Sequence, residues 1–405
     1  MNFRDHFHLP RDTHGHPLTY FCGNSLGLQP KRAEALVREE LEDWQRFAVE
    51  GHGAARRPWV PYHELVREPL ARLVGAEPLE VVAMNSLTVN LHLMMVSFYR
   101  PQGARRKIVI ERGAFPSDHH AVVSQLRFHG IDPKDGLIEL TPRDGEVCLR
   151  EDDVEALLER DGHEITLVLL PGVQYYTGQL LDLARLTRAA RAQGCAVGID
   201  AAHGVGNVPL ALHDWGADFA VWCHYKYCNA GPGAVAGCFV HARHASDFAG
   251  PRLAGWWGHD PRSRFQMRPG FIAQAGADGW QLSNPPILSL APLIASLELF
   301  DAAGGAVGLR PHSEMLTGML ERLLHQRCGD RVEVLTPAEP ARRGCQLSLR
   351  LRDGGGRAVF DALRDKGIVC DWREPDVIRV APTPLYNTAE EVDGFVASLT
   401  QILDS

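Results

Sequence analysis

One lysine stands at the end of a strongly apolar run, where a charged side chain is least expected. The run "ADFAVWC" leads into Tyr225 and Lys226, and a turn-rich "NAGPG" follows. Lysine is among the residues least often buried in proteins. A lysine that forms a Schiff base with a carbonyl compound has to lose its proton, and partial desolvation helps it to do so. The position of Lys226 therefore favours covalent chemistry with a carbonyl group.

An acidic residue and a histidine follow the preceding apolar run, "CAVGIDAAH", as Asp200 and His203. Ligands of parallel α/β sheets bind beyond the carboxyl ends of the strands, so Asp200 and Lys226 are expected in one crevice. A Schiff-base lysine and a carboxylate that keeps a pyridine nitrogen protonated are the pattern of a pyridoxal phosphate site. From these two residues alone, an ordinary ion pair between strand ends stays open as the alternative.

Three further segments bear on this choice. In "MNSLTVNLHLMM", Ser86, Leu87 and Thr88 fall at the start of an expected helix, which favours a phosphate or else a simple helix cap. In "ERGAFPSDHH", Phe115 and Asp118 follow the expected strand "RKIVIE". Phe115 could lie on a flat cofactor ring and Asp118 could bond to it; the alternative is a core phenylalanine and a turn aspartate. The glycines of "NAGPGAVAG" permit close backbone approach. Their order along the chain favours the cofactor.

Expected helices and short apolar runs alternate from about residue 65. The runs are "VVAMN", "RKIVIE", "TLVLLPGV", "GCAVGIDAAH", "ADFAVWCHY" and "GAVAGCFV". This alternation predicts an α/β fold with a mostly parallel sheet flanked by helices. Further on, "RVEVLTP", "CQLSLRLRD" and "GIVCDWREPDVIRVAP" precede a last helix and predict a smaller α+β domain. We expect an N-terminal segment over 1–50 that packs with the small domain, a large domain over 51–290 and a small domain over 291–405, with a helix over 31–48.

Composition excludes several classes of function. The chain has 405 residues, a formal net charge of −8 and scattered basic residues, which does not favour nucleic acid or an anionic membrane as a partner. No apolar run approaches the roughly 20 residues of a membrane span. The start is polar, unlike a secretory signal. The 9 cysteines contain no C-x-x-C, and a reducing cytoplasm is the expected location.

The 19 histidines include no H-E-x-x-H, and the His119–His120 and His241/His244 pairs lack partners at ligand spacing, so no metal is expected. "GNSLG", from Gly23, fits the nucleophile elbow of serine hydrolases in letters only, because no central strand precedes it and no helix follows at once.

Many of these segments are similar to those of one known family. The matching stretches, in family order, are "YFCGNSLGLQP", "GHGAARRPW", "NSLTVNLH", "FPSD", "YYTGQLLDL", "DAAHGVGNVPL", "HYKYCNAGPGAVAGCFVH", "GWWGH", "SNPPIL" and "IRVAPTPLYNT". They span nearly the whole chain. On them the chain resembles the kynureninase family, fold-type-I pyridoxal phosphate enzymes of the aminotransferase superfamily.

The resemblance implies roles for particular residues. Lys226 is the expected Schiff-base lysine, Asp200 pairs with the pyridinium nitrogen, and Tyr225 contacts the phosphate. Whether Tyr225 also moves protons at the substrate ketone is left open. The implied cofactor contacts are Leu87, Thr88, Phe115, Pro116, Ser117, Asp118, Asp200, His203, Tyr225 and Lys226, with Trp256 and Asn284 from the neighbouring subunit. The expected assembly is therefore a homodimer with shared active sites.

The resemblance also implies the substrate contacts and the reaction. Arg379 is the expected bidentate clamp for the α-carboxylate, and Asn24, Ser25 and His52 lie near the aromatic end of the substrate. The reaction is hydrolytic Cβ–Cγ cleavage of L-kynurenine, or of L-3-hydroxykynurenine, to anthranilate or 3-hydroxyanthranilate and L-alanine, in tryptophan catabolism and synthesis of NAD precursors.

One position departs from the family pattern. Family members often carry a hydroxyl residue that touches the phosphate where this chain has Pro171, which offers neither a hydroxyl nor an N–H group. Two alternatives stay open. A cysteine desulfurase would need a mobile reactive cysteine, whereas Cys223 and Cys228 are expected in a strand and a turn. A non-catalytic cofactor-binding regulator would need a basic DNA-binding extension, which this sequence does not contain.

Overall fold

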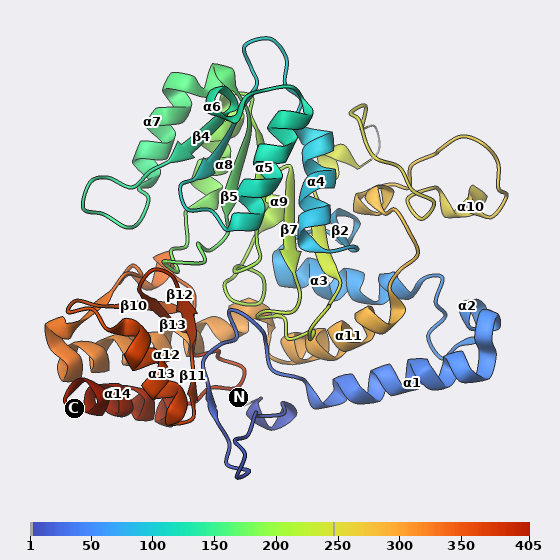
Figure 1. Cartoon of the computed structure of the whole chain (residues 1–405). Coiled ribbons are helices and arrows are strands. Elements are labelled where there is room, and N and C mark those ends of the chain that lie inside the picture. The colour runs from blue at the N-terminus through green and yellow to red at the C-terminus, as the bar shows by residue number, and fades with distance from the viewer. Residues whose placement is uncertain (1–2, 246–247) are drawn as a thin grey trace.

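The computed structural model describes residues 3–245 and 248–405. Its largest sheet has seven strands in the upper part of the molecule (Figure 1). In spatial order these are β2 (Val81–Ala83), β8 (Ala236–Val240), β7 (Phe219–Cys223), β6 (Ala196–Asp200), β5 (Ile165–Pro171), β3 (Lys107–Glu111) and β4 (Leu137–Leu140). Only β8 runs against its neighbours, so the predicted mostly parallel sheet is confirmed.

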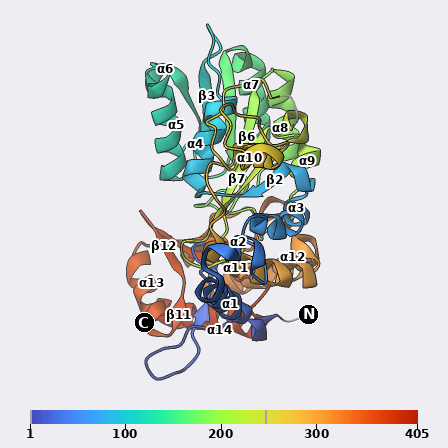
Figure 2. The ribbon, with the colours of Figure 1, turned by 90° about the vertical axis from the view of Figure 1, so that its right-hand side faces the viewer.

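Helices cover both faces of this sheet. Figure 2 shows one layer on each side of the strands. The helices around the sheet are α3 (Arg67–Val74), α4 (Leu87–Phe98), α5 (Pro116–Phe128), α6 (Pro133–Gly136), α7 (Glu151–Asp161), α8 (Leu183–Ala192) and α9 (Leu212–Trp215). The short α10 (Pro261–Arg264) lies in a loop at the right of Figure 1. The strands β2, β5, β7 and β8 are buried at every residue, because two helical layers keep water from both faces of the sheet.

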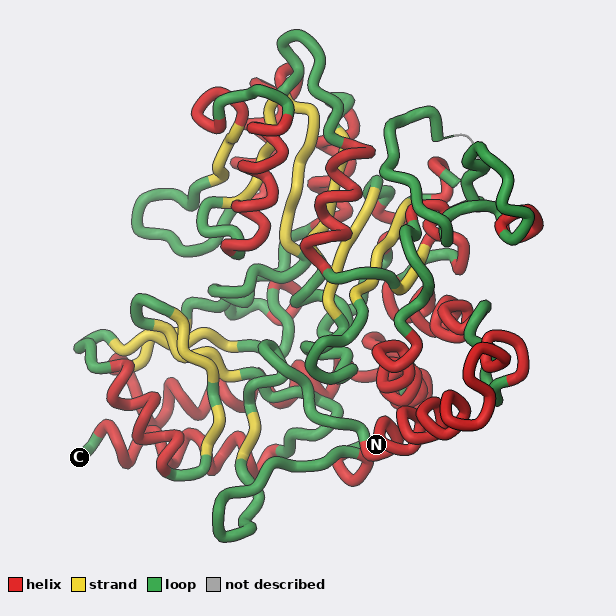
Figure 3. The backbone as a smooth tube through the Cα atoms, turned by 45° about the vertical axis from the view of Figure 1, so that its right-hand side comes forward, coloured by secondary structure: helices red, strands yellow, loops and turns green. Residues whose placement is uncertain are grey.

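A second, antiparallel sheet lies apart from the first, as the tube in Figure 3 shows. Its strands, in order, are β12 (Asp371–Arg373), β13 (Val377–Val380), β10 (Leu347–Leu351) and β9 (Val332–Val334). With α13 (Gly356–Asp365), α14 (Ala389–Leu403) and the later turns of α12 (Gly305–Cys328), it encloses a core of its own. This is the predicted smaller α+β unit.

The boundary between the two units is not sharp. Helix α11 (Ile287–Ala302) packs into the core of the large unit through Leu293 and Leu297. Helix α12 contributes Leu309 to that core and Leu320 to the small one. The domain limits expected at residues 50/51 and 290/291 stay predictions.

The first thirty residues cross between the two units. Strand β1 (Thr19–Tyr20) pairs in parallel with β11 (Ile368–Val369), and Cys22 bridges to Ala381. Phe7 and Leu28, in contrast, pack into the large core. The segment therefore fastens the small unit to the large one beside the carboxyl ends of the central strands.

Helix α1 (Lys31–Phe47) forms as predicted and is followed by the short α2 (Gly51–Ala54). Its inward side carries Glu40, which is fully buried and accepts hydrogen bonds from Arg57, Trp59 and Tyr62. Its large apolar side chains Leu41 and Trp44 are 45% and 60% exposed. The periodicity therefore marks a face that this chain does not cover by itself.

Within the described residues no single helix has the length and apolar character needed to cross a membrane. One pair, Ile287–Ala302 with Gly305–Arg331, meets the requirement together but is bent by 71°.

Candidate active site

A cavity of about 170 Å³ lies at the carboxyl ends of β3, β5, β6 and β7. The register of the sheet explains why residues from separate segments meet there, since Pro171 pairs with Asp200 and Asp200 with Val221. The cavity brings together these sequence-predicted residues: Leu87, Thr88, Phe115, Ser117, Asp118, Asp200, His203, Tyr225 and Lys226.

Lys226 lies three residues beyond β7 in a tightly held loop. Its amine nitrogen is 5.6 Å from the centre of the Phe115 ring. The Gly27 N–H donates to the Tyr225 carbonyl (2.8 Å), and the Asn229 N–H donates to the Lys226 carbonyl (2.9 Å). A Cβ on Gly27 would lie 2.3 Å from the Lys226 carbonyl oxygen, so a side chain there would push the loop away. The "GNSLG" segment thus supports the lysine loop.

Two carboxyl groups line the cavity with the lysine, a half-buried one and a buried one. Asp200 ends β6 and accepts the Ala202 N–H at 2.8 Å. Asp118, in the first turn of α5, is buried, and its Oδ1 has no hydrogen-bond partner among the described residues. Burial, and then the nearby charge of Asp200, raise the pKa of Asp118 well above its usual range. A raised pKa favours the neutral, protonated form of the Asp118 side chain.

His203 is buried on the same side, three residues beyond β6. Burial, and then the positive charge of Lys226, hold the pKa of His203 well below its usual range. The imidazole is therefore neutral at physiological pH. Its Nδ1 also lacks a partner among the described residues, so both His203 and Asp118 present an unused polar atom in a closed space.

Two helix starts form the other end of the cavity. Helix α4 begins at Leu87 after Ser86, whose side chain makes no capping hydrogen bond. Helix α5 begins at Pro116, and the Thr88 and Ser117 hydroxyls, one from each helix, lie 2.7 Å apart. Burial raises the pKa of the Tyr225 phenol, which therefore stays a hydrogen-bond donor. Such a set of donors at helix N-termini suits a phosphate.

The residues present fit pyridoxal phosphate. The amine of Lys226 could hold the aldehyde carbon, the exposed face of Phe115 could cover the ring, and the Asp118 and Asp200 pair could bond the ring nitrogen. The unpartnered Oδ1 of Asp118 and Nδ1 of His203 are the observations that carry this fit, because buried polar atoms rarely lack partners in a complete site.

Five residues of the cavity wall were not among the site residues expected from the sequence: Glu111, Pro171, Val173, Tyr175 and Ala202. Pro171, the position that departs from the family pattern, lines the cavity at the end of β5. Glu111 ends β3 and is buried. The Tyr175 ring meets the Phe115 ring edge-on at 5.2 Å and 88°. The strand-end rule could have found Glu111, since it is the last residue of "RKIVIE".

Arg379 lies behind the cavity wall and does not line the cavity. It is fully buried on β13, pairs with Asp371 and donates from Nη1 to the Tyr175 carbonyl at 2.8 Å. Arg373 shares the same Asp371 carboxylate at 3.0 Å. Burial lowers the pKa of Arg379 to about 10, so its guanidinium keeps its charge.

Other predicted residues lie outside this cavity. Asn24 is buried and donates to the Gln346 side chain at 2.9 Å, and Ser25 follows it in the same turn. His52 is exposed and meets Trp59 edge-on. The remaining members of this group are also exposed: Pro116, Trp256 and Asn284. Their roles stay predictions, and those of Trp256 and Asn284 concern the cavity of a neighbouring subunit.

The geometry gives little support to the two rival sites, a serine nucleophile elbow and a reactive cysteine. "GNSLG" forms turns, and the next helix waits until Lys31, so no nucleophile elbow is present there. Cys223 and Cys228 are buried, and burial raises the pKa of both thiols.

Among the described residues one group, Glu80, His213 and His241, has ligand atoms within 4.8 Å of one another. The Glu80 carboxylate there accepts hydrogen bonds from Ala242 N–H and pairs with His213. The expected absence of a metal stays a prediction.

Comparison with known proteins places this geometry in a family. The chain is 60% identical over 386 residues to a kynureninase of Xanthomonas campestris pv. campestris (strain B100), covering 95% of this chain and 90% of that protein. It is 58% identical over 397 residues to a kynureninase of Myxococcus xanthus, covering 98% and 93%. The family profile of the kynureninase C-terminal domain matches residues 309–399.

Solved structures bear on the fold. A cystine C–S lyase in complex with cysteine persulfide superposes with a TM-score of 0.81 at 20% identity, covering 95% of this chain and 97% of that one. The cysteine desulfurase CsdA of Escherichia coli gives 0.78 at 18% identity, covering 99% and 98%. The fold-type-I architecture is confirmed, and with about three in five residues shared over nearly the whole chain, the chain belongs to the kynureninase family.

Proposed function

We propose that the protein is a pyridoxal phosphate-dependent hydrolase that cleaves the Cβ–Cγ bond of L-kynurenine to give anthranilate and L-alanine. Membership of the kynureninase family supports the reaction. The observation that carries the proposal is the Lys226 amine, 5.6 Å from the Phe115 ring centre, in a cavity that also holds Asp118 and Asp200.

Each part of the cofactor has residues suited to it. Lys226 would hold the aldehyde carbon, and Phe115 would pack on the ring. Asp200 and the neutral Asp118 would meet the ring nitrogen, with His203 next to them. The phosphate would lie at the starts of α4 and α5, near Thr88, Ser117 and Tyr225. Pro171 offers no hydrogen-bond donor, so the two helix starts and Tyr225 would bind the phosphate.

When bound, the cofactor would supply an electron sink that makes the α-proton of the amino acid acidic. The freed Lys226 amine is then the base for that proton, because it is the only amine that lines the described cavity. The neutral phenol of Tyr225 is the candidate proton donor at the substrate ketone, where water must add before the carbon–carbon bond breaks. Arg379 would bind the α-carboxylate through its fork.

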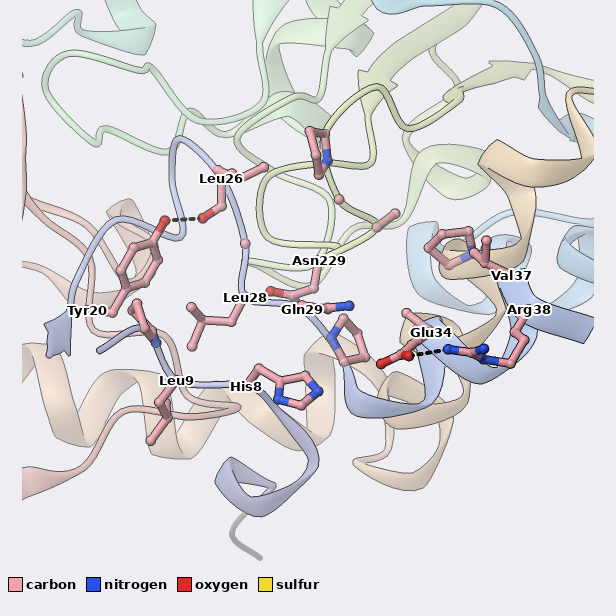
Figure 4. A pocket seen from close by; sticks show the side chains of 18 of the residues that line it. His8, Leu9, Tyr20, Leu26, Leu28, Gln29, Glu34, Val37, Arg38 and Asn229 are labelled. Atoms are coloured by element: carbon pink, nitrogen blue, oxygen red, sulfur yellow. Dashed lines mark hydrogen bonds and ion pairs between the residues drawn. The ribbon is translucent and has the colours of Figure 1, made fainter. Parts of the chain in front are cut away.

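A second copy of the chain is the proposed partner. A hollow of about 850 Å³ lies beside α1, and its apolar lining includes Leu28 and Val37 (Figure 4). Leu41 lines it too. Asn229 and Pro232, from the loop after Lys226, line it too. A subunit seated here would touch the lysine loop. Trp256 and Asn284 are exposed, as residues that contact the cavity of a neighbouring subunit would be.

The compartment is proposed to be the cytoplasm. All 9 cysteines are free, and none of those described is joined in a disulfide, which suits a reducing environment.

The decisive test is product release from L-kynurenine and, in parallel, from L-3-hydroxykynurenine. We expect anthranilate or its 3-hydroxy form to appear together with an equal amount of L-alanine, and the variant Lys226→Ala to release neither. The same preparation receives L-cysteine, and sulfide release from it would favour a desulfurase instead. No product from either kynurenine would overturn the proposal.

A further inference from the structure

One buried carboxyl group of the cavity has no role in the mechanism above. Glu111, the last residue of β3, is 6% exposed and lines the cavity that holds Lys226. It also lines a second hollow of about 260 Å³, with Pro171 and Tyr175 in the shared wall. Its side chain forms no ion pair and no hydrogen bond with another described residue. A buried carboxylate without a cation is costly, so the group needs an explanation.

The charges of the cavity point to that explanation. Three carboxyl groups, Glu111, Asp118 and Asp200, line a space that contains one amine, Lys226. Arg379, behind the cavity wall, is already paired with Asp371. A bound cofactor adds an anionic phosphate. Three ionised carboxylates in a poorly hydrated space would repel that phosphate, so the cavity favours the anion only when carboxyl groups carry protons.

Among the described residues around Glu111, none forms an ion pair with it, and the one cation in the second hollow, Arg112, is exposed to solvent. Strand β5 carries no ionisable side chain, and Glu139 on β4 is exposed. On the cavity side, burial keeps His203, Tyr175 and Tyr225 neutral. On the side of the second hollow lie an exposed Arg112 and the Glu374 carboxylate. Burial raises the pKa of Glu111 to about 8, opposed by its own backbone N–H and helped by the charge of Asp200.

We propose that Glu111 is a positioning residue that must carry a proton for the cavity to hold the cofactor tightly, so that its ionisation loosens binding and sets an alkaline limit on cofactor retention. This inference rests on the proposed function, since it concerns the same cofactor. It separates two carboxyl roles within one cavity: Asp200 acts through its charge, and Glu111 acts by staying neutral. Glutamine has nearly the shape of neutral glutamic acid and cannot ionise, so Glu111→Gln should keep the neutral state at every pH.

The test is the dissociation constant of pyridoxal phosphate for the apoprotein, measured by the absorbance of the bound cofactor as pH rises. At about pH 6.5 wild type and Glu111→Gln should bind within about twofold of each other; at about pH 9 wild type should bind about tenfold more weakly, as one lost proton requires. The ratio of the dissociation constants of the two proteins cancels the titration of the cofactor and of the groups that both proteins share. Glu139→Gln, an exposed glutamate on the neighbouring strand, should follow wild type.

Two results would overturn the inference: the same pH dependence for Glu111→Gln and wild type, or a Glu111→Gln protein that is folded but binds tenfold more weakly at the lower pH. Failure of wild type to bind the cofactor at any pH is a different outcome, because it removes the proposed function as well.

Thermal unfolding of the apoproteins gives a second readout that needs no cofactor. The pKa of Glu111 is raised in the folded state from 4.5 to about 8, so its protonated form stabilises the fold fully below the lower value. That stabilisation is lost as pH rises from 4.5 to about 8, and above about 8 it is gone. The Tm of wild type should therefore fall relative to Glu111→Gln between the two pH values. A Tm difference that does not change with pH would also contradict the inference.

Discussion

Two hollows of this molecule differ in size and in chemistry. The cavity at the strand ends measures about 170 Å³ and the groove beside α1 about 850 Å³. The small cavity gathers an amine, three carboxyl groups and two buried polar atoms that lack partners. The large groove is mostly apolar, and its charged rim residues Glu34 and Arg38 already pair with each other at 2.9 Å. A choice by volume alone would therefore have placed the active site in the groove beside α1.

The difference has a physical cause. A buried polar atom without a partner costs about 1–3 kcal/mol, so two of them in one cavity favour a polar ligand that would bond to them. An exposed apolar groove costs solubility and is relieved by another protein surface. The small cavity is thus equipped for a small polar ligand, and the large groove for a second chain. If this is right, substitutions in the cavity should impair catalysis, and substitutions in the groove should impair association of two chains.

The largest effect is expected for Lys226→Ala. Removal of the amine takes away both the covalent attachment and the base, and we expect kcat/KM for L-kynurenine to fall at least about a thousandfold. The rate of anthranilate release measures kcat/KM. The matched control is Lys134→Ala, at an exposed helix start. A variant with more than a tenth of wild-type activity would place the chemistry elsewhere.

A smaller loss is expected for Asp371→Asn. This carboxylate holds Arg379 and Arg373 from behind the cavity wall. Without it the Arg379 fork should lose its fixed orientation, and kcat/KM should fall about tenfold, mostly through KM. Steady-state kinetics separates the two constants, and Asp365→Asn, on the exposed side of α13, controls for charge. An unchanged KM would mean that Arg379 does not bind the substrate.

The groove is tested by Trp44→Arg. Trp44 is 60% exposed on α1, and a charge there should weaken association of two chains about tenfold or more. Sedimentation velocity over a dilution series reports the shift toward monomer. Phe128→Arg, on α5 and 80% exposed, has the same chemistry on another face and should leave association unchanged. Equal behaviour of the two variants would remove the groove from the interface.

The smallest effect is expected for Cys223→Ala. The thiol is buried at the end of β7, and burial raises its pKa, so it is a poor nucleophile. Kynurenine turnover should stay within about threefold of wild type. Loss of all turnover in a folded Cys223→Ala protein would reopen the thiol-based alternative.

Sequence reasoning located the small cavity because strand ends are readable. Runs such as "ADFAVWC" and "CAVGIDAAH" fix where β7 and β6 end, and the parallel order then brings Asp200 and Lys226 to one edge. The same rule applied to "RKIVIE" would have included Glu111. Strand β4 escaped notice because three of its four residues are only partly buried or exposed, so its apolar signal is weak.

Other features could not have been derived from the sequence. Periodicity groups Leu41 and Trp44 on one face of α1, but it does not say that Glu40, one turn before Trp44, is buried against Arg57. That choice depends on partners distant in the chain. The position of Arg379 behind Tyr175 likewise depends on how the small unit meets the large one. The roles assigned to Trp256 and Asn284 depend on a second chain and stay predictions.

The central claim is that the small cavity, through Lys226, holds the cofactor. Reduction of the loaded enzyme with borohydride, followed by proteolysis and mass spectrometry of every lysine-containing peptide, tests it most directly. We expect one pyridoxyl group per chain, on the peptide that contains Lys226. A pyridoxyl group on another lysine, or a cofactor that leaves the protein without any covalent mark, would contradict it.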